Sequence, residues 1–281
     1  MNTSMTDTFI AKDEFELIQS ATDYPLERSR DGRISGWFFR NKLTSVFQPV
    51  INATQNKTIG HIAYIRSGEI TLSSWQAFAQ AANDEELVNL DSLCRTIHVL
   101  NYFNKANSSY KLFVEVHPRL LENTQSNHGR IFEDLLNLIG VKTSRVVIEI
   151  PHTVNRNWKL LQQMIMSYRS RGYQVATYFD CDSKGEDDLI VKLGGLYPDI
   201  IRVQIRDLLQ HNAAASLINT IHHLGVAVLA NDIETADQAA YAIHVGADHL
   251  QGNFFSQPTH TIDVISPRLI NNILCPDYIH M

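Results

Sequence analysis

The pattern of apolar and polar residues predicts that strands and helices alternate along most of the chain. Short runs of apolar and β-branched residues predict strands: TSVFQPV, TIGHIAYIR, KLFVEV, SRVVIEI, YQVATYF, DIIRVQI and VAVLA. The first two flank a turn at NATQNK. Longer stretches between the later runs, such as WKLLQQMIMSYRSRG, repeat apolar residues at spacings of three and four, which indicates helices. Gly172 and Gly225 stand where a helix should end and a strand begin.

This alternation covers about 220 residues and predicts an α/β protein built from βα units around a parallel sheet. The predicted strands are almost continuously apolar, as expected for a sheet that is buried on both faces. No glycine-rich phosphate loop follows the first strand, so a (β/α)8 TIM-like barrel is favoured over an open doubly wound sheet. Residues 1–40 are more polar, contain the aromatic pair Trp37 and Phe38, and are predicted to form a short N-terminal extension.

Composition narrows the range of partners and compartments. The 281 residues carry a formal net charge of −6, so the chain lacks the basic surface that direct nucleic-acid binding requires. Its three cysteines, Cys94, Cys181 and Cys275, are far apart and odd in number, which argues against disulfides and against a CxxC zinc site. We find no signal-peptide pattern and no apolar run long enough to span a bilayer. These features predict a cytoplasmic protein that does not insert into a membrane.

Polar side chains fall near the ends of the predicted strands, where barrels of this type build their sites. These positions are Gln48, Glu115, Glu149, Asp180, Asp182, Arg202, Gln204, Asn231, Glu234 and Gln251. Oxygen ligands that converge on one face would suit a divalent cation. Each residue taken singly also has a simpler interpretation, as a solvated group or a helix cap. The acidic loop TYFDCDSKGEDDL fits either a solvated helix start or a weak calcium site.

Several of these strand ends, together with the block LANDIETADQAAYAIHVGADHLQGNFFSQP, resemble the EAL domain, the cyclic di-GMP phosphodiesterase barrel of bacteria. The resemblance covers residues 41–262, and it leaves residues 1–40 as the extension and 263–281 as a C-terminal helix or tail. It implies a TIM-like barrel of the EAL type. It also implies a two-metal hydrolysis in which Mg²⁺ or Mn²⁺ activates water against one phosphodiester bond.

Residue by residue, the chain departs from the family pattern. The Glu-Ala-Leu triplet corresponds to Ile62, Ala63 and Tyr64, and the lysine of the family's Lys-x-Asp to Arg202. We interpret the following residues as a vestigial site: Ile62, Glu115, Asp180, Asp182, Asn231 and Glu234. On this comparison we predict that the chain is not an enzyme, that it has no metal site, and that it needs no cofactor. Mg²⁺ or Mn²⁺ would enter only if the site were not fully lost.

Three functions follow from the resemblance. The first is a catalytically inactive regulatory protein that acts through protein–protein interaction in bacterial signalling or gene regulation, with Trp37 and Phe38 as candidate contacts. The second is a non-hydrolysing cyclic di-GMP receptor that uses Gln48, Arg66, Glu149, Arg202 and Gln251. The third is residual phosphodiesterase activity at a displaced metal site. Arg66 suits phosphate, or equally a structural ion pair inside the barrel. A homodimer is also implied by the resemblance.

Overall fold

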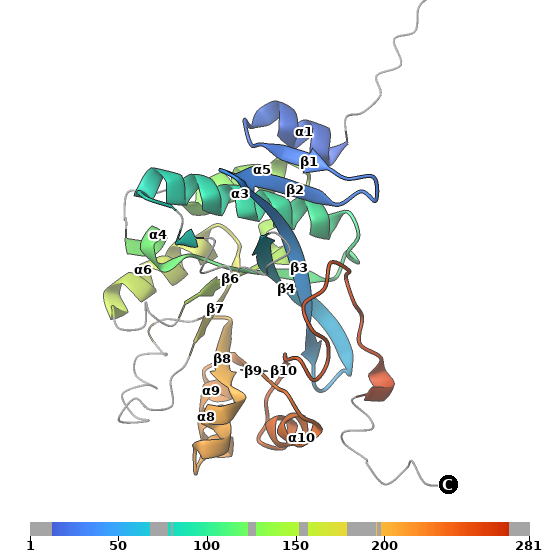
Figure 1. The fold of residues 1–281 in the computed structure, drawn as a ribbon. Coiled ribbons are helices and arrows are strands. Elements are labelled where there is room, and N and C mark those ends of the chain that lie inside the picture. The colour runs from blue at the N-terminus through green and yellow to red at the C-terminus, as the bar shows by residue number, and fades with distance from the viewer. Residues whose placement is uncertain are drawn as a thin grey trace, which may run out of the picture.

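A closed barrel of eight described strands forms the centre of the protein (Figure 1). The structure is a computed structural model that describes residues 13–67, 78–79, 81–122, 128–151, 157–178, 195 and 198–269. In chain order the barrel strands are β3 (Asn41–Asn52), β4 (Lys57–Ser67), β5 (Lys111–Glu115), β6 (Val146–Ile150), β7 (Gln174–Tyr178), β8 (Ile200–Gln204), β9 (Ala227–Asn231) and β10 (His249–Leu250). The ring closes because β3 pairs with both β10 and β4. The predicted barrel is confirmed.

Strand β3 runs antiparallel to its two neighbours, so the predicted parallel sheet is parallel only from β4 to β10. β4 to β10 pair in parallel, whereas β3 is antiparallel to both β4 and β10. The cause is local, since only a short turn joins β3 to β4 and a short turn cannot carry the chain back for a parallel pairing. The direction of β3 matters for the site, because its middle lies opposite the carboxyl-terminal half of β4.

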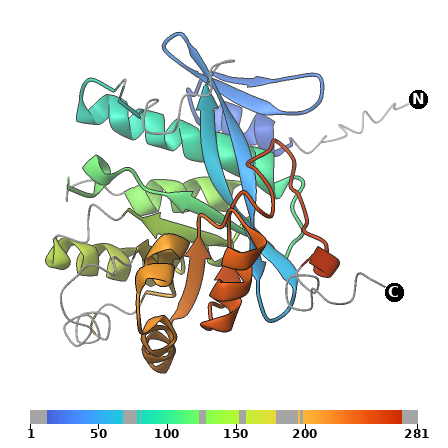
Figure 2. The same ribbon diagram turned by 60° about the horizontal axis from the view of Figure 1, so that its bottom comes forward.

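Helices surround the barrel, as the two views of Figures 1 and 2 show. They are α3 (Asp84–Phe103), α4 (Pro118–Glu122), α5 (His128–Leu138), α6 (Trp158–Ser170), α8 (Ile205–Gln210), α9 (Ala214–His223) and α10 (Ala236–His244), with a short 3₁₀ turn η1 (Thr143–Arg145) before β6. Alternate strand residues separate two cores. One fills the barrel interior and includes Ile62, Phe113, Val147 and Leu229, while the larger one lies between strands and helices. No helix in the described part of the chain has the length and apolar character needed to cross a membrane.

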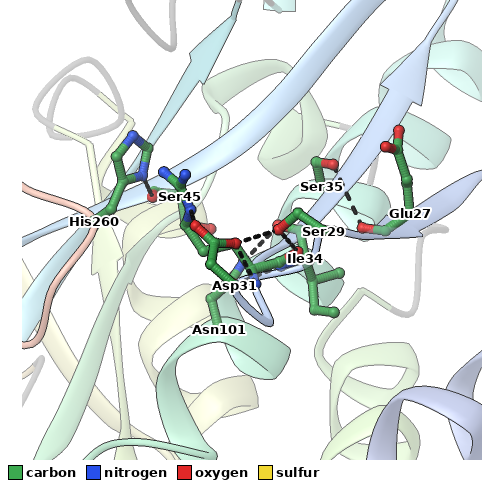
Figure 3. Close-up of polar contacts among 9 residues, drawn as sticks. Glu27, Ser29, Asp31, Ile34, Ser35, Ser45, Asn101 and His260 are labelled. Atoms are coloured by element: carbon green, nitrogen blue, oxygen red, sulfur yellow. Dashed lines mark hydrogen bonds and ion pairs between the residues drawn. The ribbon is translucent and has the colours of Figure 1, made fainter.

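The N-terminal segment adds two strands to the outside of the barrel. After α1 (Glu14–Ala21), strand β1 (Leu26–Arg28) pairs with β2 (Ile34–Phe38), which pairs with the start of β3. Asn101 on α3 fixes this segment in place: it accepts a hydrogen bond from the Ile34 N–H at 2.8 Å and donates one to the Ile34 carbonyl at 2.7 Å (Figure 3). Because Asn101 is buried, losing this pair would leave polar groups without partners.

His98 on α3 makes stability depend on pH. Its ring is buried and hydrogen-bonded to the Ser45 hydroxyl at 2.8 Å, and burial, helped by the charge of Arg95, lowers the pKa of His98 to about 3. Below pH 6.5, His98 is therefore protonated in the unfolded chain but stays neutral in the folded chain. This contribution to stability is complete above pH 6.5 and is lost as the pH falls, by about 1.4 kcal/mol per pH unit.

Between pH 6.5 and pH 5, the free energy of unfolding should fall in both proteins. We expect this fall to be about 2 kcal/mol smaller in His98→Gln than in the unmodified protein. Urea unfolding at the two pH values measures this difference. The exposed His244→Gln variant is the control and should follow the unmodified protein. Identical acid losses in all three proteins would contradict the assignment to His98.

Candidate functional site at the barrel mouth

The carboxyl ends of the parallel strands bring polar side chains to one end of the barrel, here called the mouth. The mouth residues contributed by successive strands are Glu115 on β5, Glu149 on β6, Tyr178 on β7, Arg202 on β8, Asn231 on β9 and Gln251 directly after β10. Gln48 reaches the same end from the middle of β3, where it pairs with Ile62 of β4. The expectation that Gln48 ends a strand was wrong, and it lies at the mouth because β3 is antiparallel.

Arg202 and Glu149 form a buried ion pair at the centre of the mouth. Arg202 Nη1 lies 2.5 Å from Glu149 Oε1, and the two side chains are only 5% and 1% exposed. The guanidinium also lies over the Tyr178 ring, 4.6 Å from its centroid. Burial by itself would lower the pKa of Arg202, but the Glu149 charge outweighs it and the pKa is raised. Burial raises the pKa of Glu149 against the attraction of Arg202, and the short contact favours the ionised pair.

Three buried polar atoms at the mouth have no hydrogen-bond partner within the described residues. They are Arg202 Nε, Glu149 Oε2 and Asn231 Oδ1, from strands β8, β6 and β9. Each unsatisfied buried group costs about 1–3 kcal/mol. Native proteins leave few such groups, so three on strands that lie close together indicate a place for a polar ligand.

Gln48 holds the opposite side of the mouth together. Its Nε2 donates to Asn253 Oδ1 at 3.1 Å and to the Ser256 carbonyl at 2.9 Å, and its Oε1 accepts from Gln251 Nε2 and from the Tyr64 hydroxyl. These four bonds use both N–H groups and both lone pairs of the amide. Gln48 and Gln251, both expected to contact a ligand, thus bond to each other, and this pair is called the frame here. The Gln48 amide has no donor or acceptor left for a ligand.

Arg66 lies near this frame without a carboxylate partner in the described part of the chain. Its Nη1 donates to the Ile65 carbonyl at 3.2 Å, and its guanidinium carbon is 5.8 Å from the centroid of the Tyr64 ring. The alternative of a structural ion pair therefore finds no support among the described residues. A half-buried guanidinium with donors to spare suits an anionic ligand.

The remaining predicted positions contribute unequally. Glu115 lies at the mouth with part of its surface exposed. Its pKa is raised, mainly because the surrounding protein displaces water from around its carboxyl group. The Glu149 charge raises this pKa further, and the Arg202 charge lowers it. Glu234 is exposed just before α10. Asp180 and Asp182 lie outside the described residues.

The described residues do not fit a divalent cation. Ile62 offers no donor and is buried in the barrel interior, and one oxygen of Glu149 is already bonded to a guanidinium. No cluster of three or more His, Cys, Asp or Glu side chains suited to a metal occurs among them. Because Arg202 neutralises the charge of Glu149, the ion pair attracts a dication less strongly than a free carboxylate would.

A cavity of about 350 Å³ adjoins the mouth. Tyr64, Glu115 and Tyr178 form its barrel side, and Asp91 and Arg95 of α3 are among the residues on its far side. Its size is that of a small-molecule site. The sequence indicated some residues of this site but not the contacts of Tyr64, which it gave only as a replacement in the Glu-Ala-Leu triplet, or those of Tyr178. It also missed Asn253 and Ser256, although both stand in the quoted block that contains Gln251.

Fold and site together define a TIM-like α/β barrel with a cluster of buried polar side chains at the carboxyl ends of its strands. The EAL domain model matches residues 33–258, and the chain belongs to the EAL domain family. It is 26% identical over 240 residues to the EAL-domain containing protein YkuI of Bacillus subtilis (strain 168), an alignment covering 79% of this chain and 57% of that protein. The chain thus spans less than two thirds of the length of this relative.

Two solved structures share the fold. The YkuI complex with substrate cyclic di-GMP and calcium superposes with a TM-score of 0.68 at 23% identity, covering 82% of this chain and 59% of that one. The Klebsiella pneumoniae BlrP1 complex with manganese and cyclic di-GMP also gives a TM-score of 0.68, at 22% identity over 79% and 57% of the two chains. In these two complexes a metal ion accompanies the dinucleotide, whereas a further BlrP1 structure, with FMN and cyclic di-GMP, contains no metal ions.

The prediction that the chain is not an enzyme is wrong. The family match places the chain in the EAL domain family, and cyclic di-GMP is the substrate in the solved complex of its relative YkuI. The prediction rested on single replacements such as Ile62, which change the donors of a site but do not remove the chain from its class. The expectation of no cofactor finds no support in the YkuI and BlrP1 complexes that contain calcium and manganese.

Proposed function

We propose that this chain binds cyclic di-GMP at the barrel mouth. The observation that carries the proposal is the set of three unsatisfied buried atoms, Arg202 Nε, Glu149 Oε2 and Asn231 Oδ1. They offer one donor and two acceptors, and a guanine edge and a phosphodiester together carry both kinds of complementary group. The complexes of YkuI and BlrP1 with cyclic di-GMP support the choice of ligand.

The five proposed ligand-site residues divide into two roles. Arg66, Arg202 and Glu149 are proposed to contact the ligand, because each retains hydrogen-bonding capacity at the mouth. Gln48 and Gln251 are proposed to position the loop that carries Asn253 and Ser256, because their amides bond to each other and the Gln48 amide also bonds to this loop. The ligand therefore meets a fixed frame on one side and charged groups on the other.

Arg66→Ala tests this proposal directly. We expect the affinity for cyclic di-GMP to fall by about 10- to 100-fold, the effect of one charge-assisted hydrogen bond to phosphate. Calorimetric titration of the full chain measures it, with circular dichroism to confirm that the variant is folded. Arg130→Ala, an exposed arginine on the outer helix α5, is the control. Equal affinities of the Arg66 and Arg130 variants would contradict the proposal, and chromatography of the titrated samples would reveal any linear product.

A protein partner is a second candidate, favoured by the hairpin between β2 and β3. Trp37 is 41% exposed and Phe39 is 66% exposed, whereas Phe38 is half-buried against the core. Phe39 also adopts a left-handed backbone conformation with φ of 51°, which is costly for a bulky residue. Exposed Arg40 follows it, so the surface suits a partner that is apolar and acidic.

The double variant Trp37→Ala/Phe39→Ala checks the second candidate. We expect it to lose a partner that the full chain retains in a pull-down from the source cell, because exposed aromatic side chains contribute most of the binding energy at such surfaces. Cyclic di-GMP affinity should not change, since this hairpin contributes no residue to the mouth described above. Retention of every partner by the variant would count against this surface.

A further inference from the structure

Arg202 places a permanent positive charge at the centre of the mouth. We propose that its guanidinium takes the place of a divalent cation there. It would bind an anionic phosphodiester through its positive charge, without a metal ion. The inference rests on the proposed binding of cyclic di-GMP and adds the mode of recognition. It concerns this chain's own residues, and it differs from the metal-containing complexes of YkuI and BlrP1.

The guanidinium is held in place on two sides before any ligand arrives. Glu149 fixes one edge through the 2.5 Å contact from Nη1, and the Tyr178 ring lies against its face. All three residues belong to strands of the barrel wall, which are rigid positions for a binding group. The Nε–H has no partner within the described residues and is one donor available for a phosphate oxygen.

The same arrangement works against a divalent cation. The positive charge of Arg202 partly neutralises the Glu149 carboxylate, so Glu149 attracts a second cation less strongly. Ile62 on β4, which corresponds to the glutamate of the family's Glu-Ala-Leu triplet, supplies no oxygen ligand. An arginine stays protonated at any working pH, so its repulsion of a nearby metal ion cannot be relieved by loss of a proton.

Two titrations of the full chain test the inference. The first measures Mn²⁺ binding without nucleotide by electron paramagnetic resonance, and we expect no bound Mn²⁺ for the unmodified protein. The second measures cyclic di-GMP affinity by calorimetry in EDTA and in Ca²⁺, and we expect the two values to agree within about twofold. Neither titration needs a variant, so the inference can be judged even if substitutions at Arg202 prevent folding.

Arg202→Gln adds a test of cause. We expect at least about a tenfold loss of cyclic di-GMP affinity, together with a gain of Mn²⁺ binding because the Glu149 carboxylate is released. Arg130→Gln is the matched control and should change neither quantity.

The outcomes separate this inference from the proposed function. Mn²⁺ bound by the unmodified protein, or a tenfold or larger gain of affinity in Ca²⁺, overturns the inference while leaving cyclic di-GMP binding in place. Undiminished affinity in the Arg202 variant also overturns it. If cyclic di-GMP binds in neither buffer, the proposed function fails and the anchoring role of Arg202 fails with it.

Discussion

Replacing Glu149 by leucine is expected to destabilise the protein by about 3–5 kcal/mol. The substitution leaves the Arg202 guanidinium buried, 5% exposed, with no carboxylate to neutralise it. Arg202 cannot become neutral by losing a proton, because arginine stays protonated at any working pH. The loss therefore reflects an uncompensated charge inside the barrel more than the energy of the lost contact. Urea unfolding followed by circular dichroism measures it.

The double variant Glu149→Leu/Arg202→Met separates these two contributions. Removing both charges and filling the space with apolar groups should restore most of the lost stability, because the cost of burying charge is removed together with the attraction. A single variant as stable as the unmodified protein would show that the pair is not buried as described. Stability that stays equally low in the double variant would instead point to lost packing.

Gly252→Ala is expected to cost more than about 3 kcal/mol. A Cβ atom at this position would lie against the backbone N, C and O of Ile233, closer than real Cβ atoms come. Backbone cannot move aside as a side chain can, and Ile233 is tied to this loop because its N–H donates to the Gln251 carbonyl and its carbonyl accepts from the Phe254 N–H. The strain would displace the loop that carries Gln251 and Asn253, so cyclic di-GMP affinity should fall as well.

Gly36→Ala is the control for this prediction. Its added Cβ would meet the ends of the Leu93 and Ile97 side chains at 2.8 and 2.9 Å, and such ends can shift. We expect a smaller loss of stability and no change in nucleotide affinity, because Gly36 lies on β2 outside the mouth. Equal losses in the two variants would show that backbone crowding at Gly252 is not the cause.

Much of the architecture follows from the sequence alone. Helical spacing of apolar residues, glycines at helix ends and nearly continuous apolar strands specify βα units through local interactions, so the barrel was predicted correctly. The turn NATQNK likewise predicted the β3–β4 hairpin. The motif around Gln251 indicated the EAL family, which the family match confirms.

The chemistry of the mouth depended on tertiary structure. Arg202 meets Glu149 across 53 positions of sequence, and Gln48 meets Gln251 across 203, separations at which spacing carries no information about contact. The sequence therefore offered Gln48 as a ligand contact, whereas the folded chain uses all of its hydrogen bonds internally. It also treated Arg202 as a lost lysine, whereas the barrel brings a carboxylate and an aromatic ring around it. Local pattern determined the elements and the barrel, and strand pairing decided which distant polar groups became partners, because burial forces such groups to satisfy one another.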